Sequence, residues 1–68
     1  MKYAVLFEQT ASGFSAHVPD LPGCVAAGAT LAETAELMAG AIRLHLQGLR
    51  EDGEPLPEPR TIAEYIAA

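Results

Sequence analysis

The chain has 68 residues, and nine acidic side chains against four lysines and arginines give it a formal net charge of −5. A chain of this length buries only about 60% of the surface that it exposes when unfolded, so its core is marginal and self-association is expected to support it. Its single cysteine excludes an internal disulfide, and Cys24, His17 and His45 cannot supply the clustered ligands of a structural zinc site. The negative charge opposes contact with nucleic-acid phosphates and suits a basic protein partner.

Period-two alternation predicts two strands in residues 3–8 and 14–18. The side chains expected on the core-facing side are Tyr3, Val5, Phe7, Phe14, Ala16 and Val18. The loop QTASG between the strands contains a glycine and small polar residues, which favours a hairpin. Residues 24–29, CVAAGA, predict a short third strand, because the corner before them turns the chain back beside its neighbours.

A long helix is predicted to begin at about Leu31. Thr30 and Glu33 form a capping box, in which the two side chains satisfy free N–H groups of the first turn. The apolar stripe that should cover the sheet consists of Leu31, Ala35, Met38, Ile42, Leu46 and Leu49. Gly53 and the proline two residues later are suited to ending the helix.

The last fifteen residues are predicted in two parts. Proline at every other position makes residues 54–60 an extended, stiff strut. In residues 61–68 a second Thr-x-x-Glu pair favours a short helix, and β-branched residues leave a fourth strand as the alternative. The sequence thus predicts a single α+β domain over residues 1–68, in which residues 1–53 form a three-stranded antiparallel sheet covered by one long helix.

The stretch PDLPGC, Pro19 to Cys24, raises the question of whether it is a binding site or a structural corner. Each proline fixes its own φ and biases the preceding residue toward extended backbone, so the chain must bend here. We expect the Asp20 carboxylate to bind nearby backbone N–H groups and Gly23 to adopt a conformation closed to other residues. Unless the corner folds under, Leu21 is expected to point outward, where an exposed leucine on a stiff loop would serve as a contact residue. A structural corner is favoured over a direct site.

Catalysis fits the sequence poorly. Glu8, Asp20 and Glu33 are the acids nearest the predicted sheet, and none lies centrally on a strand, as the ligands of a catalytic metal would. His17 and His45 have no nucleophile or acid at a recognisable spacing. We therefore expect no enzyme activity and no cofactor.

The remaining reactive and basic residues also favour ordinary roles. Cys24 follows a glycine and opens a strand without a positive neighbour, which favours a small buried thiol over a reactive one. The four basic residues are scattered along the chain rather than clustered, which disfavours direct binding of RNA or DNA.

In chain order the sequence contains GFSAHVPDLPGC, GATLAE, a long helix in which AI is followed by leucines, and EDGEPLPEP. This combination resembles the HicB antitoxin family over roughly residues 1 to 59. The resemblance implies a partial ribonuclease-H-like fold, a small antiparallel sheet covered by one helix. It also implies binding to HicA, a small basic toxin with a double-stranded-RNA-binding-like fold that cleaves messenger RNA using a histidine.

Two sets of residues follow from this interpretation. The residues expected to shape the module are Pro19, Asp20, Leu21, Pro22, Gly23, Cys24, Gly28, Thr30 and Glu33. One helix covers only one face of a sheet, and two leucines lie off its core-facing stripe, so further side chains need cover. The candidate surface for a partner or a second copy consists of Leu21, Leu37, Leu44, Leu6 and His17. We expect a homo-oligomer, a dimer or higher.

The sequence contains no leader pattern and no apolar run near eighteen residues, which predicts a cytoplasmic protein without membrane contact. The DNA-binding domain that follows this module in longer relatives has no counterpart in residues 1–68, so promoter binding is not expected. The predicted function is a protein-binding antitoxin of a type II toxin-antitoxin system that neutralises a HicA-type toxin. The alternative is a stand-alone HicB-like oligomeric module with a different protein or small-ligand partner.

Overall fold

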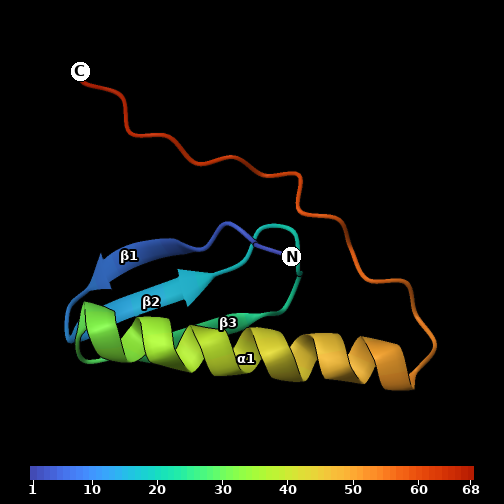
Figure 1. Ribbon diagram of the computed structural model, residues 1–68. Coiled ribbons are helices and arrows are strands. Elements are labelled where there is room, and N and C mark those ends of the chain that lie inside the picture. Colours follow the sequence, from blue (N-terminus) through green and yellow to red (C-terminus); the bar gives the residue numbers. More distant parts are fainter.

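A computed structural model describes residues 1–68 of the chain. It contains three strands and one helix in the order β1 (Leu6–Thr10), β2 (Gly13–His17), β3 (Val25–Gly28) and α1 (Leu31–Glu51). The strands form one antiparallel sheet in the order β1-β2-β3, and α1 lies across one face of it (Figure 1). The predicted α+β architecture, with three strands followed by one long helix, is confirmed.

The register of the sheet separates its two faces. Phe7 pairs with Ala16, and Ala16 pairs with Ala26, so these three side chains point to the side that α1 covers. The opposite face, which we call the open face, is formed by Leu6, Glu8, Ser15, His17, Val25 and Ala27. The predicted alternation of core-facing and outward-facing residues in the hairpin is confirmed.

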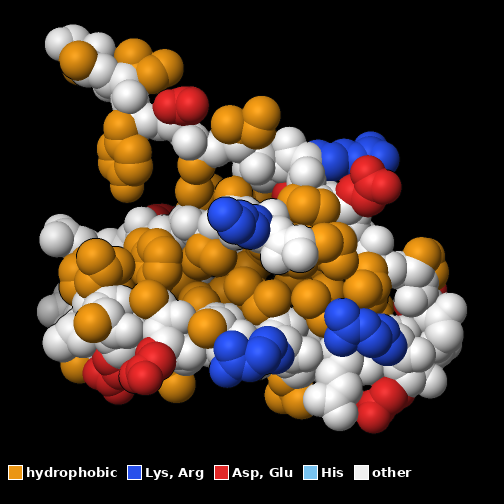
Figure 2. Space-filling view, viewed as in Figure 1, with side chains coloured by type: hydrophobic (Ala, Val, Ile, Leu, Met, Phe, Trp, Pro, Cys, Tyr) orange, Lys and Arg blue, Asp and Glu red, His pale blue; other side chains and the backbone are white.

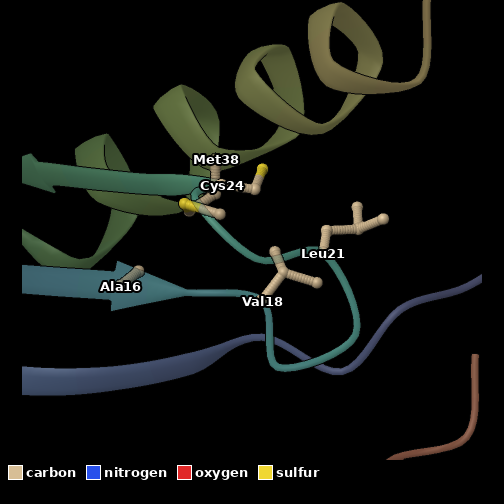
Figure 3. Packing of buried hydrophobic residues seen from close by; sticks show 5 residues of the cluster. All are labelled: Ala16, Val18, Leu21, Cys24 and Met38. Carbon is tan, nitrogen blue, oxygen red and sulfur yellow. The ribbon is translucent and has the colours of Figure 1, made fainter. Parts of the chain in front are cut away.

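The core is small. Its five buried apolar residues are Ala16, Val18, Leu21, Cys24 and Met38 (Figure 3). Met38 comes from α1, whereas the other four come from β2 and from the corner that follows it. Partly buried side chains surround this cluster: Tyr3, Val5, Ala26, Ala41, Ile42 and Leu46. Few side chains are fully removed from water, so apolar burial stabilises this fold less than it does a larger domain.

The capping box at the start of α1 is present. The Thr30 hydroxyl accepts a hydrogen bond from the Glu33 N–H at 3.1 Å, and the Glu33 carboxylate accepts one from the Ala29 N–H at 3.2 Å. The carboxylate thus reaches one residue beyond the N-cap, which differs from the usual reciprocal pair. The helix begins at Leu31, as the sequence predicts.

The other end of α1 is closed by a Schellman motif. Gly53 has a φ of 70°, its N–H donates to the Arg50 carbonyl at 3.1 Å, and the Glu54 N–H donates to the Leu49 carbonyl at 2.8 Å. These two bonds satisfy carbonyl groups that the last helical turn leaves free. The prediction that Gly53 ends the helix is confirmed.

The predicted short helix over residues 61–68 is wrong, because residues 54–68 contain neither helix nor strand. Figure 1 shows this part of the chain returning from the end of α1 past β1, and the Tyr3 hydroxyl donates a hydrogen bond to the Pro57 carbonyl oxygen on the way. The Thr61 N–H and hydroxyl donate instead to a carboxylate elsewhere in the molecule. A single short turn without a packing partner does not offset the cost of helix nucleation.

A branched side chain at position 23 is expected to strain the backbone rather than to clash. Gly23 has a φ of 84°, and a Cβ atom there would meet nothing within 4 Å. Gly23→Val should lower the free energy of unfolding by about 1 to 3 kcal/mol in chemical denaturation. Gly48→Ala is the control, because Gly48 also has open space around it but lies within α1, where alanine is expected to stabilise by up to about 1 kcal/mol. Equal losses in both variants would contradict the backbone explanation.

Candidate functional site

The corner formed by residues 18–24 is closed by its own backbone. The Leu21 N–H donates to the Val18 carbonyl at 3.0 Å, and the Cys24 N–H donates to the Leu21 carbonyl at 3.0 Å. The Val18 N–H then donates to the Cys24 carbonyl at 3.2 Å, which sets the two ends of the corner side by side. The predicted bend and the predicted positive φ of Gly23 are both confirmed, and the bend directs β3 back along β2.

Leu21 lies inside this corner and has 0% of its surface exposed. Its side chain belongs to the same cluster as those of Val18, Cys24 and Met38, beneath α1 (Figure 3). The prediction that Leu21 points outward as a contact residue is therefore wrong. The two turn hydrogen bonds at its N–H and carbonyl curl the backbone inward, and burial of the apolar side chain favours that arrangement.

The Asp20 carboxylate binds a distant part of the chain and not its neighbours, which corrects the prediction of a local turn bond. Oδ2 accepts the backbone N–H groups of Arg60 at 3.0 Å and Thr61 at 2.9 Å. Oδ1 accepts the Thr61 hydroxyl at 2.9 Å. These three bonds, which we call the Asp20 clamp, join the corner to a segment forty residues further along.

The clamp favours the charged form of Asp20. The Thr61 N–H holds the pKa of the Asp20 carboxyl below its usual range, and the Thr61 hydroxyl, the Arg60 N–H and the Arg60 charge act in the same direction. Desolvation opposes them without reversing the direction. At neutral pH the carboxylate is therefore ionised and can accept all three hydrogen bonds.

Four of the five predicted surface residues are exposed. Leu6 and His17 lie on the open face, where the neighbouring Val25 is 64% exposed. Leu37 and Leu44 lie on α1 away from the sheet, and Leu44 is 70% exposed. The structure thus separates the predicted set into two surfaces, on the sheet and on the helix, and removes Leu21 from it.

The module residues at the β3–α1 junction lie close together. Gly28 packs against the start of α1, since a Cβ atom there would lie 2.8 Å from the Thr34 Oγ1 atom. Thr34 is fully buried, and its hydroxyl donates to the Thr30 carbonyl at 2.7 Å. Thr34 was not among the residues predicted from the sequence, although a threonine one turn into a helix that covers a sheet is a signal for such a bond.

Sequence analysis also missed both partners of Asp20, because nothing local marks Arg60 and Thr61 as donors to the corner. The structure shows a buried thiol at Cys24, as predicted, and this burial raises the pKa of the thiol. No three histidine, cysteine, aspartate or glutamate side chains are grouped as metal ligands would be, and the surface contains no pocket. The one helix lacks the combination of length and hydropathy that crossing a bilayer requires.

Charged side chains of both signs surround an apolar area between α1 and the C-terminal segment in Figure 2. With its exposed leucines, open sheet face and clamped C-terminal segment, the molecule is a small α+β module whose candidate site is a surface. The family profile described as HicB_like antitoxin of bacterial toxin-antitoxin system matches residues 3–68. The chain therefore belongs to the HicB-like antitoxin family.

Two individual proteins are similar to nearly the whole chain. An uncharacterized 14.9 kDa protein of Haemophilus phage HP1 is 41% identical over 66 residues, which cover 97% of this chain and 50% of the phage protein. The chain thus spans about half the length of that relative. The UPF0150 protein Ta0767 of Thermoplasma acidophilum is 36% identical over 67 residues, which cover 97% of this chain and 94% of that protein.

A solved structure supports the fold. A chain of the HicA3 and HicB3 toxin-antitoxin complex superposes with a TM-score of 0.74 and 33% sequence identity. The match covers 87% of this chain and 70% of that chain.

Acid is expected to open the Asp20 clamp. The pKa of Asp20 is lower in the folded protein than in the unfolded chain. The contribution of Asp20 to stability is therefore fully present above the ordinary aspartate pKa of about 3.9. It is lost as the pH falls through the lowered folded-state pKa. The amide signals of Arg60 and Thr61 followed by NMR should therefore shift with a midpoint below that ordinary value. Asp20→Asn is the control, because its amide nitrogen cannot accept a hydrogen bond and its side chain does not titrate. A midpoint above about 3.9, or the same transition in the Asn variant, would contradict the clamp.

Cys24 is expected to resist alkylation. Iodoacetamide needs an accessible thiolate, and the Cys24 thiol is buried with a raised pKa. In the native protein at pH 8, mass spectrometry should therefore detect labelling at least about tenfold slower than in urea-unfolded protein. Equal labelling rates in the two states would show that the corner opens freely.

Proposed function

We propose that the protein binds a HicA-type toxin, a small basic ribonuclease, and neutralises it by direct contact. The observation that carries the proposal is the match to a chain of the HicA3 and HicB3 complex, which extends over 87% of this molecule. Membership of the HicB-like antitoxin family supports the same role. In this proposal the protein acts in the cytoplasm by binding alone, without a cofactor, catalysis or direct contact with nucleic acid.

Charge supports a basic partner. The protein has a formal net charge of −5, and opposite net charges speed the diffusional encounter of two proteins. Part of this effect is screened by salt, because the Debye length falls to about 8 Å at physiological ionic strength. Complex formation should accordingly slow as salt is added.

We assign the contact to the outer face of α1. Leu37 and Leu44 are two helical turns apart and therefore lie on the same side, and both are exposed. Glu33 lies one turn before Leu37, and Glu51 lies two turns after Leu44, so acidic groups stand at both ends of this apolar pair. An apolar centre with a charged rim is the usual anatomy of a protein interface. The helix also carries the exposed Arg43 and Arg50, but the groups at the two ends of this pair are acidic and suit a basic partner.

Self-association belongs to the same proposal. The core has five buried apolar residues, and the open face leaves Leu6, His17 and Val25 without cover. A dimer that buries a standard interface of about 800 Å² on each subunit would stabilise such a fold. The protein is thus a homo-oligomer, most simply a dimer, whose contacts lie on the sheet side and leave α1 free for the toxin.

Replacing both helix leucines should weaken toxin binding selectively. Leu37→Ser with Leu44→Ser is expected to raise the dissociation constant for a HicA-type toxin encoded in the same genome by about tenfold or more, measured by calorimetry. Val25→Ser on the open face is the matched control, because it removes an equally exposed apolar side chain away from α1. In cells that express the toxin, the wild-type protein and the Val25→Ser control should restore growth better than the helix variant does.

Absence of both binding at micromolar concentration and growth rescue would refute the proposal and favour a HicB-like oligomeric module with a different partner. Equal losses in the helix variant and the Val25→Ser control would instead place the toxin contact elsewhere on the molecule.

A further inference from the structure

The segment beyond the Asp20 clamp, residues 62–68, is irregular, exposed and apolar, and it has no packing partner. Ile62 is 84% exposed, Ile66 is 88% exposed, and the Tyr65 side chain is fully exposed. Figure 2 shows apolar side chains on this segment standing clear of the rest of the molecule. Three large apolar side chains among seven residues are more than a segment of a soluble monomer usually presents to water.

The composition of this segment suits a β-strand. Isoleucine and tyrosine are enriched in strands, and an extended backbone places Ile62 and Ile66 on one side and Tyr65 on the other. Glu64 is the only charged residue in residues 62–68. None of the backbone–backbone hydrogen bonds of the protein involves residues 55–68, so the backbone donors and acceptors of the segment are free to pair.

The matching surface is the outer edge of β1. This strand pairs only with β2, so its other edge lacks a neighbour, and all five of its residues are exposed. The helix packs mainly on β2 and β3, which leaves Phe7 uncovered at the margin of the helix-facing side. Leu6 is likewise exposed on the open face. A strand added here would cover one apolar side chain on each face of the sheet.

We propose that residues 62–68 of one molecule add as a fourth strand to the β1 edge of a second copy, which returns the same contact. The inference rests on the self-association proposed above and specifies the segment and the edge that form it. An exposed edge and an exposed strand-forming segment occur in the same chain, and their reciprocal exchange closes a dimer of twofold symmetry without leaving either contact open.

Charge contributes little to this contact, and its two acidic residues would oppose pairing if they faced each other. The β1 strand and residues 62–68 contain one charged residue each, Glu8 and Glu64, so backbone pairing and apolar contact dominate. A basic toxin gains more from the acidic groups around the outer face of α1. The two contacts therefore occupy different surfaces and can form together.

The Asp20 clamp determines where the exchanging strand leaves its own molecule. By holding Arg60 and Thr61 to the corner, it fixes the chain immediately before Ile62, and Figure 1 shows the following residues running away from the sheet. A strand whose starting point is fixed loses less conformational freedom when it binds. The same three bonds therefore favour exchange with a second copy over free motion of the segment.

Cross-linking between two variants that each carry one added cysteine tests the contact directly. Glu8→Cys protein is mixed with Glu64→Cys protein and treated with a bis-maleimide, and Cys24 remains unreactive because it is buried. A covalent heterodimer is expected. The matched control mixes Leu44→Cys with Glu64→Cys, which should give at least about fivefold less product because Leu44 lies on α1. Equal yields from the two mixtures would overturn the proposal.

The double variant Glu8→Cys with Glu64→Cys identifies which sheet the segment joins. Under the proposal it gives covalent dimers joined by one or two links and no higher species. A product linked only within single molecules would mean that the segment pairs with its own β1, and this would overturn the exchange.

Sedimentation across a dilution series tests whether the contact carries the dimer. Ile62→Ser with Ile66→Ser should raise the dimer dissociation constant by about tenfold or more, while Leu37→Ser with Leu44→Ser should leave it unchanged. If the wild-type protein is a dimer and the isoleucine variant dimerises equally well, this inference is overturned, while the proposal of self-association stands. A monomeric wild-type protein would refute both this inference and the proposal of self-association. Toxin binding by the isoleucine variant is measured separately, and that measurement tests the proposed function.

Discussion

The path of residues 54–68 depends on one carboxylate. Asp20 accepts hydrogen bonds from two backbone N–H groups and one hydroxyl at residues 60 and 61, and no other side chain of the protein receives three. The donors lower the pKa of the carboxyl, so the ion that makes these bonds is also the form that the surroundings favour. The hydrogen bond from Tyr3 to the Pro57 carbonyl oxygen is a second tie between the returning segment and the body.

The clamp works because the corner that carries Asp20 is part of the core. Three of the five buried apolar residues, Val18, Leu21 and Cys24, lie in residues 18–24, and turn hydrogen bonds within the corner hold their backbone. In a larger domain a connection between strands would lie over the surface, whereas a chain of 68 residues has too little interior to leave its loops outside. PDLPGC is thus a corner whose one leucine faces inward and whose one acid faces a distant segment.

Local patterns in the sequence predicted most of the fold. Alternation in the hairpin, the capping pair Thr30 and Glu33, and Gly53 at the helix end each depend on residues close in the chain, and the structure contains all of them. Three of the errors share a cause, because the orientation of Leu21, the partners of Asp20 and the conformation of residues 61–68 are set by contacts across the fold. A Thr-x-x-Glu pattern predicts a helix at residues 61–68 from local residues alone, whereas Thr61 is bound to the corner through its N–H and its hydroxyl. The two exposed leucines of α1 could be predicted from helical period alone, whereas the exposed apolar segment beyond the clamp could not.

The central claim is that the corner and the C-terminal segment are one energetic unit. A double-mutant cycle between Asp20 and Thr61 measures this coupling directly, with Asp20→Ala and Thr61→Val combined and the free energy of unfolding determined for all four proteins. The account predicts that Thr61→Val destabilises the wild-type protein but has almost no effect once Asp20 is replaced, because the hydroxyl has then already lost its acceptor. Additive effects of the two substitutions would contradict the account, since they would mean that the two residues stabilise the protein independently.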